Sequence, residues 1–127
     1  SAASDVYKRQ GLKNAYPKSK ITAVFQPHRY SRLIPLLKEF SRSFVSSDKV
    51  FISNVYSANE RKPVNFNLNK IIKLVGKGSN TVSCYLNSLD DIKEEMKKSK
   101  KDEIYIFLGA GDITDWPYKI LDDLNEN

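Results

Sequence analysis

The sequence predicts an α/β domain in which a mostly parallel sheet is covered by helices on both faces. Four short runs of β-branched and aromatic residues are each bounded by polar or turn residues, as buried strands are; they span residues 21–25, 50–55, 82–86 and 104–108. Amphipathic stretches with helical spacing lie between these runs. Strands that alternate with helices in this way form right-handed βαβ crossovers, so we expect a Rossmann-like architecture. A chain of 127 residues has the size of one domain.

The first helix between strands is expected over Leu33 to Phe44, where apolar residues recur at helical spacing. Ser31 is a suitable N-cap for it, and Pro35 is tolerated because it falls in the opening turn.

The second helix is expected from Leu68, with Asn67 as its N-cap and Gly76 ending it in the left-handed conformation. The third begins with Ser88 and Asp91, which have the spacing of a capping box. It closes on a group of lysines, which we interpret as a solvated helix end: Lys97, Lys98, Lys100 and Lys101.

The N-terminal part fits this pattern less well. Residues 4–15 could form a helix capped by Ser4 and ended by Tyr16-Pro17, but Gly11 interrupts it and its apolar face is thin. We expect residues 1–10 to be a non-native or poorly ordered tail and residues 11–127 to form the domain.

The positive charge is placed unevenly along the chain. Residues 1–60 carry ten Lys or Arg and four Asp or Glu, whereas residues 61–127 carry eleven of each, so the net charge of +6 comes from the first half. Such a surplus can attract phosphate groups, or it can serve solubility alone.

Other composition features limit the class of protein. No apolar run approaches the roughly 20 residues that cross a bilayer. Cys84 is the single cysteine and excludes an internal disulfide, so we expect a reducing, cytoplasmic setting. His28 is the single histidine, so a metal site built by this chain alone is not expected.

The segment after the first strand is the main candidate site, because ligands of parallel sheets bind beyond the carboxyl ends of the strands. It places His28, Arg29 and Arg32 in a turn and the first helical turn. Cations are unfavourable at a helix N-terminus unless an anion is present. Either the two guanidinium groups grip a carboxylate or phosphate, or they bend away and pair with surface acids. The residues alone leave both readings open.

Two further segments would share this edge of the sheet. The last strand runs into Gly109-Ala110-Gly111-Asp112, a tight turn that lacks the third glycine of a dinucleotide fingerprint. The second strand is followed by Asn54, Tyr56, Asn59 and Glu60, of which Glu60 is either a ligand contact or an ordinary loop acid. No catalytic pair can be assigned from spacing, and we interpret Gly76–Ser79 as a helix end rather than a phosphate loop.

Several of these residues occur together in a known family. The shared motifs are Tyr16-Pro17, ITAVFQPHRYSR over residues 21–32, NVYSANE over 54–60 and GAGDI over 109–113. With them the chain resembles, from about residue 11 to its end, the C-terminal domain of the UDP-N-acetylmuramate:L-alanine ligases, which are part of the Mur ligase family. FQPHRYSR is the most specific element, because other Mur ligases differ after the equivalent strand.

The resemblance implies ATP-dependent amide-bond formation in bacterial peptidoglycan synthesis, with ATP and Mg²⁺ as cofactors. It implies UDP-N-acetylmuramate and L-alanine as substrates, and neither a membrane nor nucleic acid as partner. In that family the C-terminal domain presents the amino acid, so Arg29 and Arg32 would hold its carboxylate while His28 and Tyr30 shape the pocket. The rim would include Gly109, Ala110, Gly111 and Asp112.

The chain also departs from the family pattern. The family usually has Asp in place of Asn54 and Gly in place of Asn59, and the phosphate-binding loop and the other two domains are absent from these residues. We therefore expect a fragment that has no ligase activity alone. The alternatives are the C-terminal domain of another Mur ligase, or a free-standing α/β module that binds phosphorylated ligands or nucleic acid.

Overall fold

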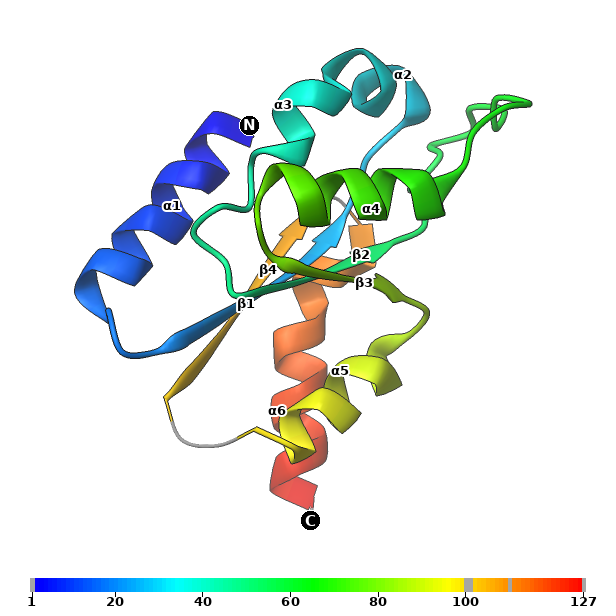
Figure 1. Cartoon of the computed structure of the whole chain (residues 1–127). Coiled ribbons are helices and arrows are strands. Elements are labelled where there is room, and N and C mark those ends of the chain that lie inside the picture. The colour runs from blue at the N-terminus through cyan, green and yellow to red at the C-terminus, as the bar shows by residue number, and fades with distance from the viewer. Residues whose placement is uncertain (1, 100–101, 110, 127) are drawn as a thin grey trace.

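The four expected strands form one parallel sheet with the order β3-β2-β1-β4 (Figure 1). The computed structural model describes residues 2–99, 102–109 and 111–126. The strands are β1 (Lys20–Gln26), β2 (Lys49–Ser53), β3 (Val82–Leu86) and β4 (Glu103–Gly109). The helices are α1 (Ala2–Ala15), α2 (Tyr30–Leu33), η1 (Ile34–Leu36), α3 (Leu37–Ser41), α4 (Leu68–Gly78), α5 (Leu89–Lys97), η2 (Gly111–Asp115) and α6 (Trp116–Glu126). The predicted α/β class is confirmed.

The strand order contains a reversal next to β1. The chain moves outward from β1 to β2 and β3, and then returns across the sheet so that β4 pairs with the other side of β1. At the carboxyl edge, Gln26 lies opposite Gly109 and Phe25 lies opposite Ile52. The segments that follow β1 and β4 therefore leave the sheet side by side, in opposite layers.

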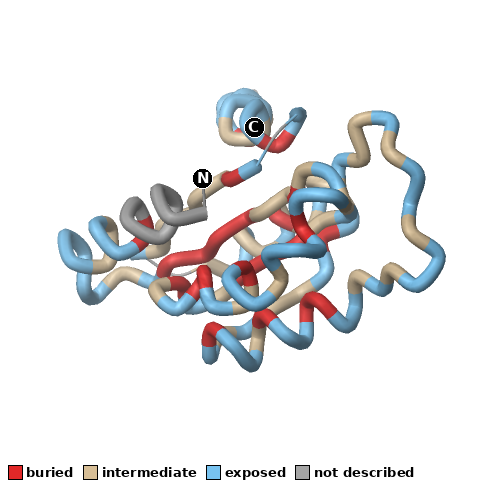
Figure 2. The backbone as a smooth tube through the Cα atoms, turned by 90° about the horizontal axis from the view of Figure 1, so that it is seen from above, coloured by how far each residue is buried: buried red, intermediate tan, exposed pale blue. Residues whose placement is uncertain are grey.

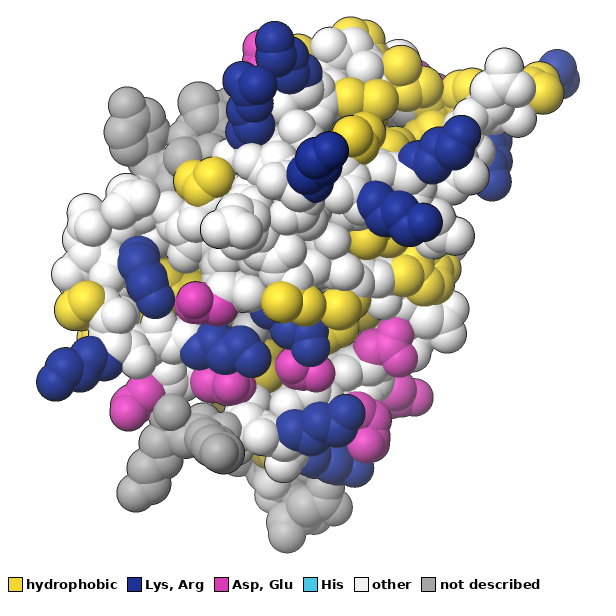
Figure 3. Space-filling view, viewed as in Figure 1, with side chains coloured by type: hydrophobic (Ala, Val, Ile, Leu, Met, Phe, Trp, Pro, Cys, Tyr) yellow, Lys and Arg dark blue, Asp and Glu magenta, His cyan; other side chains and the backbone are white. Residues whose placement is uncertain are grey.

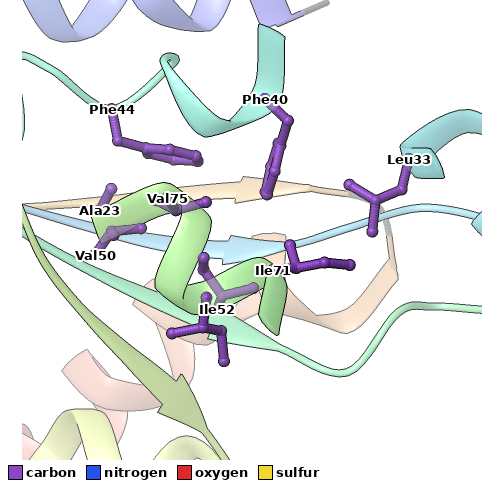
Figure 4. Packing of buried hydrophobic residues seen from close by; sticks show 9 residues of the cluster. Ala23, Leu33, Phe40, Phe44, Val50, Ile52, Ile71 and Val75 are labelled. Atoms are coloured by element: carbon purple, nitrogen blue, oxygen red, sulfur yellow. The ribbon is translucent and has the colours of Figure 1, made fainter. Parts of the chain in front are cut away.

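Each face of the sheet is covered by its own layer of helices. In Figure 1, α1, α3 and α4 lie on one side of the strands and α5 and α6 lie on the other. On the first side, Phe40 and Phe44 point toward the sheet (Figure 4), in one buried cluster with Ala23, Val50 and Val75. On the second side, a separate cluster joins the sheet to α5 and α6: Val24, Phe51, Leu86, Ile92, Ile113 and Ile120.

The helix expected between β1 and β2 is broken into three pieces. α2 and α3 are separated by a 3₁₀ turn that contains Pro35. Proline has no backbone N–H and clashes with the preceding turn, so a continuous α-helix cannot pass through it. The expectation that Ser31 is the N-cap is wrong, because α2 begins at Tyr30 and Arg29 occupies the cap position.

The expectation for Gly76 is also wrong, because α4 continues to Gly78 and ends at Ser79 in a right-handed conformation. A Cβ on Gly76 would lie 2.6 Å from Ser83 Oγ, and one on Gly78 would lie 2.7 Å from the Ser41 carbonyl oxygen. These glycines therefore permit close packing of α4 against β3 and α3. The left-handed residue after the helix is Asn80, with φ 49°, and the Thr81 N–H beyond it donates to the Gly76 carbonyl oxygen at 3.1 Å.

Two predicted N-caps are confirmed. Asn67 Oδ1 accepts a hydrogen bond from the Lys70 backbone N–H at 3.2 Å. Ser88 and Asp91 form the capping box of α5, with Asp91 Oδ2 accepting from the Ser88 N–H at 3.3 Å. Lys97 and Lys98 are exposed at the end of this helix, while Lys100 and Lys101 lie outside the described residues.

The N-terminal helix begins at Ala2, earlier than Ser4, and ends at Ala15. Residues 2–10, for which we expected a non-native or poorly ordered tail, lie in α1, and the expected start of the domain at residue 11 stays a prediction. Arg9 is 1% exposed, and its guanidinium group lies 4.6 Å from the centre of the Phe44 ring and donates to the Ser43 carbonyl oxygen.

The surface charge is segregated on the face seen in Figure 3. Lys and Arg side chains lie over both halves of this face, whereas Asp and Glu gather mainly over the lower half, toward α5 and α6. Seen from above, buried chain runs through the strands, and the segment between β2 and α4 projects from the body as exposed or half-buried chain (Figure 2). Within the described residues, none of the helices has the length and apolar content needed to cross a bilayer.

Candidate functional site

The segments that follow β1, β2 and β4 meet at the carboxyl edge of the sheet, where the strand order reverses. Crevices of this kind are where open α/β sheets bind their ligands. A Cβ on Gly111 would lie 3.4 Å from Gln26 Oε1 and 3.7 Å from Cδ2 of Tyr56, so the turn after β4 lies against both other segments. The structure thus brings together the candidate segments 28–32, 54–60 and 109–112, except that Ala110 lies outside the described residues.

His28 and Tyr56 join the first two segments. They form an isolated parallel β-bridge, in which the Tyr56 N–H donates to the Pro27 carbonyl oxygen at 2.8 Å and the Arg29 N–H donates to the Tyr56 carbonyl oxygen at 2.8 Å. Their rings stack with centroids 5.6 Å apart and planes 21° apart. The half-buried His28 therefore lines the site, and backbone pairing with Tyr56 holds it in place.

Arg29 has an unusual backbone conformation, with φ 64° and ψ 134°. Residues with a Cβ avoid this region, because it costs on the order of 1–3 kcal/mol, and they keep it only where the surroundings impose it. The hydrogen bond from Arg29 N–H to Tyr56 is one such constraint. Backbone strain of this kind gathers at functional sites, so it singles out Arg29 independently of its charge.

Arg29 and Arg32 are both exposed at the start of α2. Arg32 Nη1 lies 3.5 Å from His28 Nδ1. Among the described residues, neither arginine has a carboxylate oxygen within 4.0 Å of its guanidinium nitrogens. The reading in which the two side chains pair with surface acids is therefore not what the described residues adopt.

The start of α2 nevertheless has an anionic partner, which is Glu60. Glu60 Oε1 accepts from the Ser31 N–H at 3.2 Å, and Oε2 accepts from the Ser31 hydroxyl. The Ser31 hydroxyl, the backbone N–H groups of Ser31 and Tyr30, and the charge of Arg29 together lower the pKa of Glu60 below its usual value. α2 has only four residues, so its dipole is weaker than the expected longer helix would provide.

The loop that contains Glu60 is shaped by two left-handed residues, Ala58 with φ 48° and Asn59 with φ 71°. Glycine and asparagine adopt this conformation more readily than other residues. Asn59 therefore adopts a conformation that asparagine, like glycine, tolerates well.

A cavity of about 450 Å³ adjoins this site between the projecting loop and β3. Tyr30 packs edge to face on Phe66, with ring centroids 4.8 Å apart, and Phe66 is part of the cavity wall. Asn54 Nδ2 donates to the Tyr85 hydroxyl at 2.9 Å across it. Ser31 and Phe66 were not among the site residues expected from the sequence. Each contact joins α2 to the β2–α4 loop, whose path no local pattern predicts.

The turn after β4 is held close to β1. Gly109 has φ 137°, and a Cβ there would lie 2.4 Å from the Gln26 carbonyl oxygen. Gly111 has φ 82°, and its carbonyl oxygen accepts from Thr114 Oγ1 at 3.0 Å. Gly109, Gly111 and the exposed Asp112 thus form one rim of the crevice.

The described side chains form no group of three or more His, Cys, Asp or Glu that could hold a metal ion. Cys84 is free and half-buried in β3, where it packs against the cluster on the α5 side of the sheet. We assign no role in the site to it.

Curated relatives of this chain include UDP-N-acetylmuramate–L-alanine ligases of several bacteria. UDP-N-acetylmuramate–L-alanine ligase of Fusobacterium nucleatum is 39% identical over 106 residues, which are 84% of this chain and 22% of that protein. The enzyme of the same name from Acaryochloris marina is 33% identical over 125 residues, covering 96% of this chain and 24% of the relative. The chain thus spans about a quarter of the length of the curated relatives it matches. No family model matches the chain.

Solved structures show the same fold. UDP-N-acetylmuramate–alanine ligase of Thermotoga maritima matches 99% of this chain with 25% of its own, at a TM-score of 0.69 and 19% identity. A murein peptide ligase of Psychrobacter arcticus matches 96% of this chain with 25% of its own, at a TM-score of 0.70 and 16% identity.

Proposed function

Because this chain corresponds to the C-terminal domain of the UDP-N-acetylmuramate–L-alanine ligases, we propose that it holds the incoming amino acid of such a ligase. The complete enzyme would join the carboxyl group of UDP-N-acetylmuramate to the amine of L-alanine in the bacterial cytoplasm, with ATP as the energy source. We expect neither a membrane nor nucleic acid among its partners.

Arg29 and Arg32 are the groups that would hold the amino acid's carboxylate. The observation that supports this role most directly is that both guanidinium groups are exposed at the crevice without a carboxylate within 4.0 Å among the described residues. A guanidinium group offers forked N–H donors that match the two oxygens of a carboxylate. The half-buried side chains of His28 and Tyr30 would limit the space beside it.

The described residues do not form a cradle for Mg²⁺ and ATP. Gly76–Ser79 is the end of α4 and packs on Ser41 and Ser83, so its backbone N–H groups are not arranged as in a phosphate loop. Among the described side chains, no group of three or more His, Cys, Asp or Glu is arranged to hold a metal ion. We therefore expect nucleotide binding mainly by other parts of the ligase, and no ligase activity from the 127-residue chain alone.

The test is the L-alanine dependence of the full-length ligase that contains this domain. We expect Arg29→Ala to raise KM for L-alanine by about tenfold or more, because a charge-assisted contact to the substrate is lost. The matched control is Arg42→Ala, which removes the same charge from an exposed position at the end of α3. An Arg29→Ala enzyme with an unchanged KM for L-alanine would contradict the proposal.

A free-standing module that binds phosphorylated ligands or nucleic acid is the second candidate, favoured by the scarcity of acidic side chains over the upper half of the face in Figure 3. Binding to a phosphate backbone weakens steeply with salt and depends on many cations. Tight, salt-sensitive binding of nucleic acid that survives Arg29→Ala would favour this candidate over the ligase domain.

A further inference from the structure

We propose that Glu60 is a positioning residue that fastens the β2–α4 loop to α2 and thereby sets where Arg29 and Arg32 present their guanidinium groups. The inference rests on the proposed function, in that it takes the two arginines to be the carboxylate-binding groups. Glu60 itself is not expected to touch the amino acid.

The connection between the two segments has two parts. The first is backbone pairing, in which Arg29 N–H donates to Tyr56 and Tyr56 N–H donates to Pro27, both at 2.8 Å. The second is the pair of hydrogen bonds from Ser31 to the two oxygens of Glu60. Ser31 lies between the two arginines in sequence, so these bonds act on the turn of helix that bears them.

The backbone around Glu60 is fixed by a tight turn within the β2–α4 loop. Glu60 lies in the loop between β2 and α4 that projects from the body (Figure 1), in which Val64 is 99% exposed. Its backbone N–H donates to the Ser57 carbonyl oxygen at 3.0 Å, closing a tight turn around the left-handed Ala58 and Asn59. Residues in such conformations persist only where neighbouring contacts impose them. The turn therefore aims the Glu60 carboxylate at Ser31.

A carboxylate suits this position better than a neutral acceptor. Each oxygen of Glu60 accepts from a different donor of Ser31, which one amide oxygen of glutamine cannot do with the same geometry. Arg29 attracts Glu60 electrostatically, yet no oxygen of Glu60 lies within 4.0 Å of its guanidinium nitrogens. Glu60 thus restrains the segment while Arg29 stays free for another carboxylate.

The experiment compares Glu60→Gln, Ser31→Ala and the double variant in the full-length ligase. We expect each single variant to raise KM for L-alanine about fivefold while kcat and KM for ATP change little, because small displacements of a substrate-holding group weaken its contact. The double variant should be no worse than the worse single variant, because both changes break one connection. Glu39→Gln is the control, since it removes the same charge from an exposed position in α3.

Each other outcome overturns the proposal in a recognisable way. A lower kcat with unchanged KM values means that Glu60 only supports folding. Effects of Glu60→Gln and Ser31→Ala that multiply in the double variant mean that the two residues act separately. An unchanged KM in Glu60→Gln, in an enzyme where Arg29→Ala raises it, removes the positioning role but leaves the carboxylate clamp. An unchanged KM in Arg29→Ala removes the clamp and the inference together.

Discussion

Gly109→Ala tests how tightly the rim of the site is tied to the sheet. Gly109 has φ 137°, a conformation that costs a residue with a Cβ on the order of 1–3 kcal/mol. The added Cβ would also lie 2.4 Å from the Gln26 carbonyl oxygen. The usual separation of a carbon and an oxygen in contact is about 3.3 Å, so the ends of β1 and β4 must separate by about 1 Å. We expect the free energy of unfolding to fall by about 2–4 kcal/mol.

The assay is urea unfolding of the 127-residue chain, followed by far-UV circular dichroism, with the midpoint and the slope both fitted. Gly11→Ala is the matched control, because no atom lies within 4 Å of the added Cβ and the residue is exposed in α1. That variant should gain up to about 1 kcal/mol from helix propensity. A Gly109→Ala chain whose unfolding curve overlays the wild-type curve would refute the steric reasoning.

Two further predictions concern packing and capping. Phe44→Ala should lower the free energy of unfolding by about 3–5 kcal/mol, because a fully buried ring in contact with Phe25 and Phe40 is removed. The control is Val45→Ala at the neighbouring position, which is 58% exposed. It should change the free energy of unfolding by less than about 0.5 kcal/mol in the same denaturation assay. Asn67→Ala should cost about 1 kcal/mol by removing the acceptor for Lys70 N–H. The control is Asn69→Ala, because Asn69 lies in the same turn but is not the N-cap residue. Equal losses of stability in the two variants, measured by thermal unfolding, would contradict the capping assignment.

The strands, and the edge of the sheet at which the candidate site lies, could be predicted because they depend on local composition. Residues 21–25 and 104–108 are rich in β-branched and aromatic residues, and both runs lie within observed strands. The alternation with helices then implied parallel pairing, and parallel pairing implied that polar residues after the strands would meet. His28, Arg29 and Gly111 do lie at one edge for this reason.

The parts that could not be predicted depend on contacts between segments distant in sequence. Apolar periodicity from Leu33 to Phe44 resembled one helix, yet Pro35 divides it into α2, η1 and α3. Gly76 had the sequence context of a helix end, but its environment is set by Ser83 of β3. Glu60 looked like an ordinary loop acid, and its role at Ser31 follows from the left-handed backbone before it. Pairing across 29 residues leaves no periodic trace in the sequence.

The pairing of Gln26 with Gly109 limits which sequence changes the domain can accept in evolution. The register between β1 and β4 sets the dimensions of the crevice. A shift of one residue between these strands would displace one rim by about 3.3 Å and move its side chains to the opposite face of the sheet. Sequence changes should therefore be tolerated in the exposed segment around Val64, while the last pair of β1 and β4 stays fixed.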